Sequence, residues 1–243
     1  YPIYQLGFIS LFMFIAYFIF NSSRKSEQNQ VWAGMAKETA HQIGTPLSSL
    51  MAWLELLKEK PENSKMVKEM EKDISRLETI TDRFSKIGSK AELTKTNIVE
   101  LINHCIEYLK SRMPINSRFI VEAENKNIII PLSPILFEWV IENLVKNAVD
   151  AIKGKGEIII SINENNTNVI INIKDNGEGI NQTILKNIFK PGVTSKKRGW
   201  GLGLSLSKRI IEQYHKGNIF VMQSEKGVGS TFTIELPKNI NKI

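Results

Sequence analysis

Two stretches of the sequence repeat apolar residues at alternating spacings of four and three, and this pattern limits the possible folds more than any other feature. The first seam consists of Ala36, Ala40, Ile43, Leu47, Leu50, Leu54 and Leu57. The second consists of Met66, Met70, Asp73, Leu77, Ile80, Phe84 and Ile87, with one polar interruption at Asp73. Two long helices with matching seams and a short turn predict an antiparallel helical hairpin at residues 31–88. Because one hairpin leaves apolar surface uncovered, we expect two copies to form a four-helix bundle, which makes the protein a homodimer.

Residues 1–20 carry no charged side chain and are long enough to cross a bilayer as a helix. Arg24 and Lys25 follow directly, and basic residues beside a membrane span favour the cytoplasmic side. A signal peptide would have a basic leader and a cleavage site, and a buried helix would have a polar stripe, but the sequence has neither pattern. We therefore expect a transmembrane helix at residues 1–20 in the inner (cytoplasmic) membrane, a linker at residues 21–30, and the rest of the chain facing the cytoplasm. Since no initiator methionine is present, we also expect a fragment of a longer chain.

The composition is that of an ordinary globular protein, with 42% hydrophobic and 23% charged residues, which argues against extended disorder. The single cysteine, Cys105, excludes an internal disulfide and a cysteine-based zinc site. A net charge of +7 suits nucleic acid, an anionic membrane surface or a nucleotide ligand. Because the lysines are scattered and no nucleic-acid recognition motif occurs, we expect no direct nucleic acid binding.

Beyond residue 95 the pattern mixes helices and strands. We predict helices at residues 97–112, 135–152, 182–188 and 202–215, and strands at residues 118–124, 128–132, 157–163, 168–174, 218–224 and 230–236. Residues 88–95 interrupt the helical pattern and are predicted to be a linker. The expected fold class is α+β: a transmembrane helix, a dimerising helical hairpin, and one α/β domain at residues 96–238.

Three polar residues follow one another on a single face of the predicted helix at residues 135–152. Asn143, Asn147 and Asp150 lie opposite an apolar face. Two amide oxygens one turn apart suit a hard cation that keeps waters and phosphates as its other ligands. A solvated polar stripe has the same spacing, so this pattern alone leaves both interpretations open.

The segment NVIINIKD places three apolar residues and Asp175 on the same side of a predicted strand. Asp175 thus continues an apolar face, where an unpaired carboxylate would be costly. The segment DNGEGI follows, and its Gly177 and Gly179 permit a tight turn and the close approach of a ligand. A bare turn and a ligand contact both remain open here.

A third element combines glycines with basic residues. Gly199, Gly201 and Gly203 alternate at the start of a predicted helix, where backbone N–H groups can receive phosphate. Lys196 and Lys197 precede them in a loop that can fold over a nucleotide. The pattern is neither a dinucleotide-binding fingerprint nor a P-loop. Alone it is weak, but joined to the two preceding elements in this order it indicates a nucleotide site.

The segments NLVKNAVDAI, DNGEGI, the loop containing Phe189, GWGLGL and GVGSTF resemble the N, G1, F, G2 and G3 boxes of the sensor histidine kinases, and AHQIGTPL resembles their phosphoacceptor box. The motifs occur in the order and spacing of that family and cover essentially everything after residue 30. The resemblance implies a Bergerat-type ATP-binding domain, which is an α/β sandwich, with ATP and Mg²⁺ as cofactors. It also implies a protein-histidine kinase of a two-component system, whose partner is the receiver domain of a response regulator.

The resemblance further implies roles for single residues. Asn147 is expected to bind Mg²⁺, with Asn143 supporting the site, and Asp175 is expected to accept a hydrogen bond from the adenine amino group. In related hydrolysing ATPases a glutamate stands where Asn143 is, and an amide cannot activate water, which fits transfer to a side chain. The other expected nucleotide-binding residues are Asp150, Gly177, Gly179, Lys196, Lys197, Gly199, Gly201, Leu202, Gly203 and Thr231.

His41 is the phosphoacceptor that the resemblance implies, and neutral imidazole can attack in line near pH 7. Gln42 stands where many relatives carry Glu or Asp, and it accepts a hydrogen bond but cannot act as a base. Our hypothesis is that Glu38, one turn earlier, orients the ring. Thr45 matches the position from which relatives direct water to dephosphorylate the response regulator. Pro46 breaks the helix and is interpreted as a hinge.

Two other functions fit part of the pattern. Gln42 favours a membrane-bound, nucleotide-binding dimeric scaffold without kinase activity, whereas the intact nucleotide motifs disfavour it. An ATPase of the same superfamily without transfer to histidine is disfavoured by the hairpin and by Asn143.

Overall fold

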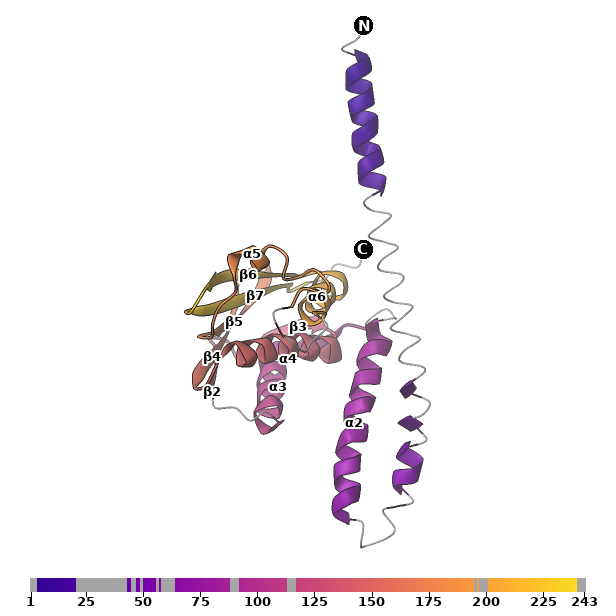
Figure 1. Cartoon of the computed structure of the whole chain (residues 1–243), viewed down its shortest axis with the longest axis vertical. Helices are drawn as coiled ribbons and strands as arrows, with labels where there is room; N and C mark the ends of the chain where they lie inside the picture. Colours follow the sequence, from indigo (N-terminus) through magenta and orange to yellow (C-terminus); the bar gives the residue numbers. More distant parts are fainter. Residues whose placement is uncertain are drawn as a thin grey trace. The chain divides into compact units, whose positions relative to one another are not determined.

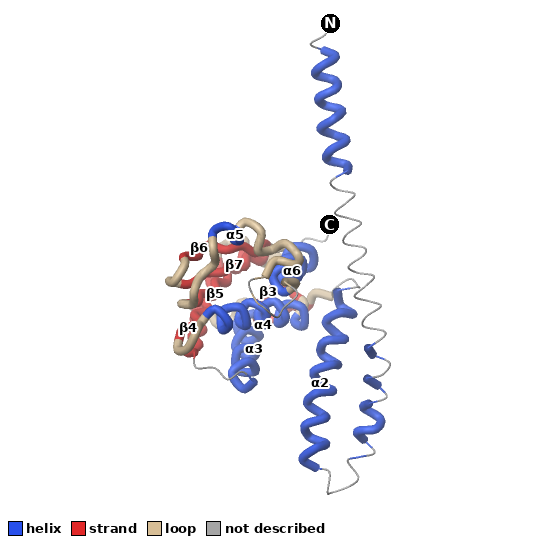
Figure 2. Tube along the Cα trace, in the orientation of Figure 1, coloured by secondary structure: helices blue, strands red, loops and turns tan. Residues whose placement is uncertain are grey.

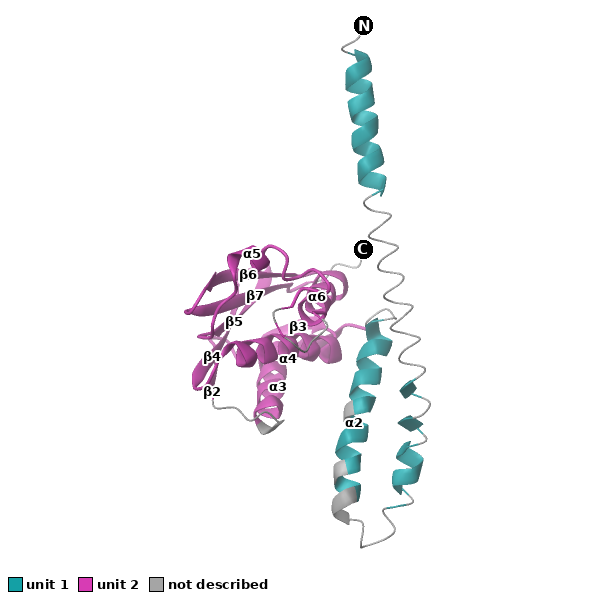
Figure 3. Ribbon diagram, in the orientation of Figure 1, with its two compact units in different colours: residues 1–90 teal, residues 91–243 magenta. Residues whose placement is uncertain are grey.

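The structure is a computed structural model of the chain, and it describes residues 4–20, 43–44, 47–48, 50–55, 57, 64–87, 92–112, 117–194, 196 and 201–239. The chain divides into two compact units, residues 1–90 and residues 91–243 (Figure 3). Residues 4–20 of the first unit are helical, and their side chains are exposed. Within the described ranges, none of the helices combines the length and the apolar character needed to cross a membrane.

The first unit also contains two helical segments that pack against each other. One is α2 (Ser64–Ile87), and the other comprises the described residues between 43 and 57 (Figure 1). A buried cluster joins them, formed by Leu47, Leu54, Val67 and Ile74 with Leu57 and Met70 packed against it. Val67 and Ile74 each stand one position after a predicted seam residue. Each helix of a four-helix bundle contacts two neighbours, so its apolar face is wider than one seam.

Several large apolar side chains of this pair remain exposed within one chain. Trp53 is 63% exposed, Leu50 is 43% exposed, and Leu77 and Ile80 of α2 are 39% and 40% exposed. Three of these four belong to the predicted seams. The helical pair therefore keeps an apolar surface that a single copy does not cover.

The second unit is built on a five-stranded sheet with the order β2-β4-β5-β7-β6. The strands are β2 (Ser117–Ala123), β4 (Gly156–Glu164), β5 (Asn168–Asp175), β6 (Asn218–Glu225) and β7 (Gly229–Pro237). Strand β2 is parallel to β4, and the other neighbours are antiparallel. A separate two-stranded sheet pairs β1 (Thr94–Asn97) with β3 (Ile129–Leu132). The sequence does not predict strand β1, whose first two residues lie in the predicted linker, because its polar residues TKTN have no alternating apolar pattern.

Helices cover one face of the large sheet, which makes a two-layer α/β sandwich (Figure 2). They are α3 (Ile98–Arg112), α4 (Pro134–Ala151), α6 (Gly203–Arg209) and the π-helical turn η2 (Ile210–Tyr214); the short helix α5 (Gln182–Leu185) follows β5 in the chain. Alternate residues of the inner strands point into the core, among them Ile160, Ile171 and Ile234. This alternation is the period-two pattern that the sequence carries.

His215 joins the start of α4 to the end of η2. Its Nε2 accepts a hydrogen bond from the Ser133 backbone N–H at 3.1 Å, and its Nδ1 lies 3.0 Å from the Ile210 carbonyl oxygen. Since Nε2 is an acceptor, Nδ1 carries the proton and donates. Burial of the ring lowers the pKa of His215, and the two backbone contacts oppose that shift in part. The neutral ring is thus a structural link within the core.

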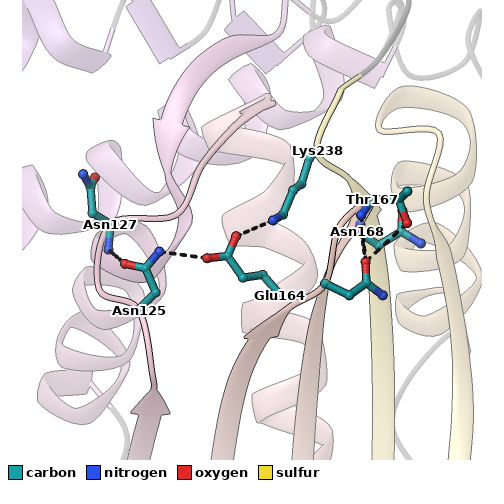
Figure 4. Close-up of polar contacts among 7 residues, drawn as sticks. Asn125, Asn127, Glu164, Thr167, Asn168 and Lys238 are labelled. Carbon is teal, nitrogen blue, oxygen red and sulfur yellow. Dashed lines mark hydrogen bonds and ion pairs between the residues drawn. The ribbon is translucent and has the colours of Figure 1, made fainter.

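A polar network closes the end of the sheet at which β4 ends and β5 begins (Figure 4). Glu164 accepts a hydrogen bond from Asn125 at 2.8 Å and pairs with Lys238 at 2.6 Å. These two side-chain contacts lower the pKa of Glu164. The Asn165 side chain accepts from the backbone N–H groups of Thr167 and Asn168 and fixes the turn. The network joins the segment after β2, the β4–β5 turn and the segment after β7. It lies at the end of the sheet opposite to Asp175.

Candidate functional site

The polar face of α4 begins with Asn143, which lies close to the first residue of α6. A Cβ atom placed on Gly203 would lie 3.7 Å from the Asn143 Oδ1, an ordinary van der Waals distance, so the two residues are direct neighbours. The Nδ2 of Asn143 is buried and has no hydrogen-bond partner among the described residues. A buried donor without a partner is costly, which favours a ligand that accepts from it.

One turn further along α4, Asn147 and Asp150 contact the loop that precedes α6. The Lys196 Nζ donates to the Asn147 Oδ1 at 2.9 Å and to the Asp150 Oδ2 at 2.5 Å. The Lys196 and Asp150 side chains are 42% and 52% exposed, so this ion pair lies in contact with solvent. The Lys196 ammonium group therefore contacts both the amide oxygen of Asn147 and a carboxylate oxygen of Asp150.

Asp175 is buried at the end of β5, with 4% of its surface exposed. Its Oδ1 accepts a hydrogen bond from the Gly177 backbone N–H at 2.9 Å. Burial raises the pKa of Asp175, whereas the backbone N–H groups of Gly177 and Ser230 lower it in part. The carboxylate is thus buried with limited compensation, as expected of a group that a ligand is to contact.

The loop after Asp175 fits tightly between α4 and the β6–β7 turn. The Glu178 N–H donates to the Ala151 carbonyl at 3.0 Å, and the Gly227 N–H donates to the Glu178 carbonyl at 2.8 Å. Gly179 has φ +68°, and a Cβ atom there would lie 2.1 Å from the Glu225 carbonyl oxygen. Only glycine fits both conditions, because other residues rarely adopt this backbone conformation and any side chain would overlap that carbonyl.

The loop bearing Lys196 is closed at its base by glycines. The Gly192 N–H donates to the Gly201 carbonyl at 3.1 Å, and Gly201 has φ +63°. We call residues 193–200 the lid, of which the structure describes Val193, Thr194 and Lys196. This hydrogen bond therefore joins the two glycines that flank the lid.

The structure brings most of the described site residues into two groups. Asn143 lies beside Gly203, and Asn147 and Asp150 hold Lys196; Leu202 precedes Gly203 at the start of α6. Asp175, Gly177 and Gly179 form the second group. The predicted residues His41, Glu38, Gln42, Thr45, Lys197 and Gly199 lie outside the described residues.

Thr231 does not join Asp175. It pairs with Lys174 in the sheet, whereas Asp175 pairs with Ser230, and neighbouring residues of a strand point to opposite faces. The Ser230 hydroxyl lies 2.9 Å from that of Ser224, which also accepts from the Ile180 N–H at 2.8 Å. The prediction missed both serines. Ser230 shares its parity with the apolar residues of β7 that point inward, and this signal was available in the sequence.

Comparisons with known proteins agree on the class of domain. The family described as "Histidine kinase-, DNA gyrase B-, and HSP90-like ATPase" matches residues 133–240. The family described as "His Kinase A (phospho-acceptor) domain" matches residues 32–90. The second unit is thus an ATPase-type domain of this family, and a phosphoacceptor-type domain precedes it on the same chain.

Two of the most similar relatives are named as kinases. Sporulation kinase D of Bacillus subtilis (strain 168) is 29% identical over 93% of this chain and 47% of its own length. Sensor histidine kinase ZraS of Escherichia coli (strain K12) is 32% identical over 90% of this chain and 48% of its own length. The chain therefore spans about half the length of these relatives.

Solved structures give the same result. The catalytic domain of histidine kinase ThkA has a TM-score of 0.55 and 31% identity, over 60% of this chain and 96% of that one. ThkA in complex with the response regulator protein TrrA has a TM-score of 0.57 and 27% identity, over 90% of this chain and 66% of that one. This chain belongs to the sensor histidine kinases.

Proposed function

We propose that this chain is the core of an ATP-dependent protein-histidine kinase, which phosphorylates itself at His41 and passes the phosphoryl group to an aspartate of a response regulator. One observation carries the proposal: a phosphoacceptor match at residues 32–90, which includes His41, and an ATPase match at residues 133–240 occur on one chain. An ATPase domain alone would suit hydrolysis, and a phosphoacceptor hairpin alone would lack a phosphoryl source.

The residues of the second unit fit a magnesium-bound adenine nucleotide. Asn143 has a buried donor without a partner among the described residues, and Asn147 has an amide oxygen of the kind that Mg²⁺ prefers. We assign the metal to Asn147, supported by Asn143. We assign the adenine amino group to the buried carboxylate of Asp175, with Gly177 and Gly179 shaping the pocket.

The phosphates are assigned to the lid and the start of α6. Lys196 and Lys197 supply positive charge there, and the backbone amides come from Gly199, Gly201, Leu202 and Gly203. Mg²⁺, when bound, neutralises phosphate charge and holds the phosphates in place. Positioning and charge neutralisation are the main contributions that such a site makes to phosphoryl transfer.

In the transfer step, one ring nitrogen of neutral His41 forms a bond to the γ-phosphorus while the bond from that phosphorus to the bridging oxygen breaks. ADP leaves with the bridging oxygen, and the other ring nitrogen releases its proton to solvent water. Gln42 accepts a hydrogen bond but cannot take the proton, so we propose that Glu38 orients the ring. The amide of Asn143 cannot activate water, which favours His41 over hydrolysis.

We further propose that the phosphorylated hairpin transfers to the receiver domain of a response regulator. ThkA, whose structure is similar over 90% of this chain, was solved in complex with a response regulator protein. Thr45 follows His41 by four positions in the sequence, and we propose that it directs water at the phosphorylated regulator, as in relatives. Phosphatase activity toward the regulator is thus part of the proposal.

The quaternary and membrane arrangement completes the proposal. Leu50, Trp53, Leu77 and Ile80 are exposed within one chain, and a second copy of the hairpin would cover them in a four-helix bundle. Residues 1–20 have no charged side chain, and the described residues 4–20 present apolar side chains on all sides. We propose that this segment anchors the chain in the cytoplasmic membrane, with the kinase on the cytoplasmic side.

The proposal is tested with γ-labelled ATP and Mg²⁺. Wild type is expected to acquire label that is labile in acid and stable in base, which is the behaviour of phosphohistidine. The His41→Gln variant is expected to bind nucleotide as wild type does and to acquire no label. Absence of label on wild type would remove the kinase proposal, and label of equal intensity on the variant would remove His41 as the acceptor.

A further inference from the structure

The side chain of Asn176 continues the pairing of β4 with β5 beyond the last residue of β5. Asp175 pairs with Ile158 in the sheet, and Asn176 and Glu157 stand next to that pair. The Asn176 N–H donates to the Glu157 carbonyl at 3.4 Å, and the Glu157 N–H donates to the Asn176 side-chain Oδ1 at 2.8 Å. In a regular antiparallel pair the second bond would go to the backbone carbonyl of residue 176. The side chain takes the place of that carbonyl, so the chain can turn away from the sheet at this residue.

The surroundings of the Asn176 amide are closely fitted. A Cβ atom built on Gly156 would lie 2.7 Å from the Asn176 Oδ1 and 2.5 Å from the Ile152 side chain, so a larger residue at position 156 would displace a neighbour. Asn176 itself is exposed, and its bond with the Glu157 N–H lies at the surface. Because such a bond adds only modestly to overall stability, its main effect is on the local turn.

The turn at Asn176 brings Gly177 to the carboxylate of Asp175. The Gly177 N–H donates to the Asp175 Oδ1 at 2.9 Å. Gly177 also faces the end of α4, where a Cβ atom built on it would lie 2.7 Å from the Ala151 carbonyl oxygen. The Glu178 N–H donates to the same carbonyl at 3.0 Å. The position of the Gly177 N–H is therefore set from two sides, by the turn that precedes it and by the end of α4.

We propose that Asn176 is a positioning residue for recognition of the nucleobase. Its side chain holds the turn that places the Gly177 N–H on Asp175, and this N–H fixes the direction in which the carboxylate faces. The inference rests on the proposed function, which assigns the amino group of adenine to Asp175. Asn176 stands outside the predicted nucleotide-binding residues, and it acts on the base only through Asp175.

Hydrogen-bond geometry makes selection of the base sensitive to this turn. Without the side-chain oxygen, the Glu157 N–H is left to the backbone carbonyl of residue 176, and pairing with that carbonyl draws the turn toward the strand. A hydrogen bond weakens steeply as its angle falls below about 120°, so a carboxylate that turns away loses much of its contact with an amino group. Affinity for adenine then falls relative to a base without the amino group, whereas contacts with the phosphates are affected equally for both bases.

The experiment measures the affinity of the full chain, with Mg²⁺, for ADP and for purine riboside 5′-diphosphate, which lacks the amino group of adenine. Isothermal titration gives both dissociation constants, and the preference for ADP is their ratio, from which effects on the phosphates cancel. Asn176→Ala is expected to reduce this preference about three- to tenfold. Asn176→Asp keeps an acceptor oxygen in the same place and is expected to retain the wild-type preference within about twofold.

Two further variants separate positioning from a general loss of stability. Asn165→Ala is the matched control, because the Asn165 side chain accepts from the backbone N–H groups of Thr167 and Asn168, at 2.9 and 2.7 Å, at the other end of β4 and β5. It is expected to keep the wild-type preference for ADP. Asn176→Ala is also made in an Asp175→Asn background, where it is expected to leave the preference unchanged, because the carboxylate through which Asn176 acts is gone.

Each outcome decides the proposal. A wild-type preference in Asn176→Ala overturns it, and so does an equal loss of preference in Asn165→Ala, in Asn176→Asp or in the Asp175→Asn background. If wild type binds neither nucleotide, or binds both equally well, the proposed nucleotide site or its assignment of Asp175 fails, and the inference fails with it. If wild type prefers ADP and Asn176→Ala prefers it as strongly, only the inference fails.

Discussion

The Asp175 carboxylate lies buried at the end of β5, and burial raises its pKa. A carboxyl group whose pKa is raised on folding stabilises the fold fully below its unfolded pKa of about 3.9, and loses that contribution as the pH rises through the folded value. The free energy of unfolding of wild type, relative to Asp175→Asn, should therefore fall between pH 4.5 and pH 7.5. Each unit of pKa shift contributes about 1.4 kcal/mol. Urea unfolding of both proteins at the two pH values measures the difference.

The same variant addresses the proposed adenine contact. The amide introduced by Asp175→Asn would offer its oxygen to the Gly177 N–H, but it lacks the charge that strengthens a hydrogen bond from an adenine amino group. We expect adenine nucleotides to bind about 10- to 100-fold more weakly. If the variant bound adenine nucleotides with the affinity of wild type, the proposed contact between Asp175 and adenine would be excluded.

His215 gives a second dependence on pH, with the opposite sign. Its pKa is lowered by burial, so as the pH falls below the unfolded value of about 6.5 the unfolded chain binds a proton that the folded ring does not. Stability should therefore decrease from pH 8 to pH 5.5. The His215→Gln variant is expected to lose this part of the dependence, and to unfold with about 1–3 kcal/mol less free energy at pH 8 because the Ser133 N–H loses its acceptor.

Thermal or chemical unfolding across that pH range measures both effects. The variant His104→Gln removes an exposed histidine of α3 and serves as the matched control, with the wild-type dependence retained. If the free energy of unfolding changed equally with pH in wild type and in His215→Gln, the role given to the buried ring would be contradicted.

At the scale of the element, strand β7 distinguishes two adjacent hydroxyl residues. Ser230 lies beside Asp175 and contacts Ser224, whereas Thr231 points to the other face of the sheet. We expect Ser230→Ala to weaken binding of adenine nucleotides about three- to tenfold, by removing a hydroxyl that borders the buried carboxylate. Thr231→Ala is the matched control, and its affinity should stay within about twofold of wild type. Titration with a fluorescent ATP analogue compares them, and the reverse order of effects would refute the assignment.

The same strands explain how far the sequence predicts the fold. In runs such as Ile158–Ile162, buried and less buried residues alternate, because β-branched side chains on a half-buried surface leave a clear pattern. The ends of the observed strand β4 therefore lie within a residue of the predicted ends. Strand β1 has no such pattern, and only its pairing with β3 reveals it. Likewise, the alternation of β5 and β7 predicts that Asp175 and Ser230 both point inward, but that Ser230 stands opposite Asp175 depends on which strands are neighbours. Pairing between distant strands is what local patterns do not contain.

At the scale of the whole molecule, the first unit keeps apolar surface that one chain does not bury. Ile80 is 40% exposed on α2, and burying such a side chain contributes about 1.5–3 kcal/mol. We expect Ile80→Glu to raise the dimer dissociation constant at least about tenfold, as measured by analytical ultracentrifugation. Lys68→Glu introduces a negative charge at an exposed position of the same helix and is expected to leave the dimer intact. A variant Ile80→Glu that sediments as wild type would exclude this face from the interface.

The loop at Gly179 has a consequence for inhibition. Gly179 has a positive φ, and a Cβ atom built on it would lie 2.1 Å from the Glu225 carbonyl oxygen, so no other amino acid fits there. An inhibitor that made its contacts with the backbone of this loop would therefore address a surface that point mutation cannot alter without disrupting the turn. Resistance would have to arise at neighbouring side chains, and a compound that avoids them would leave few routes of escape.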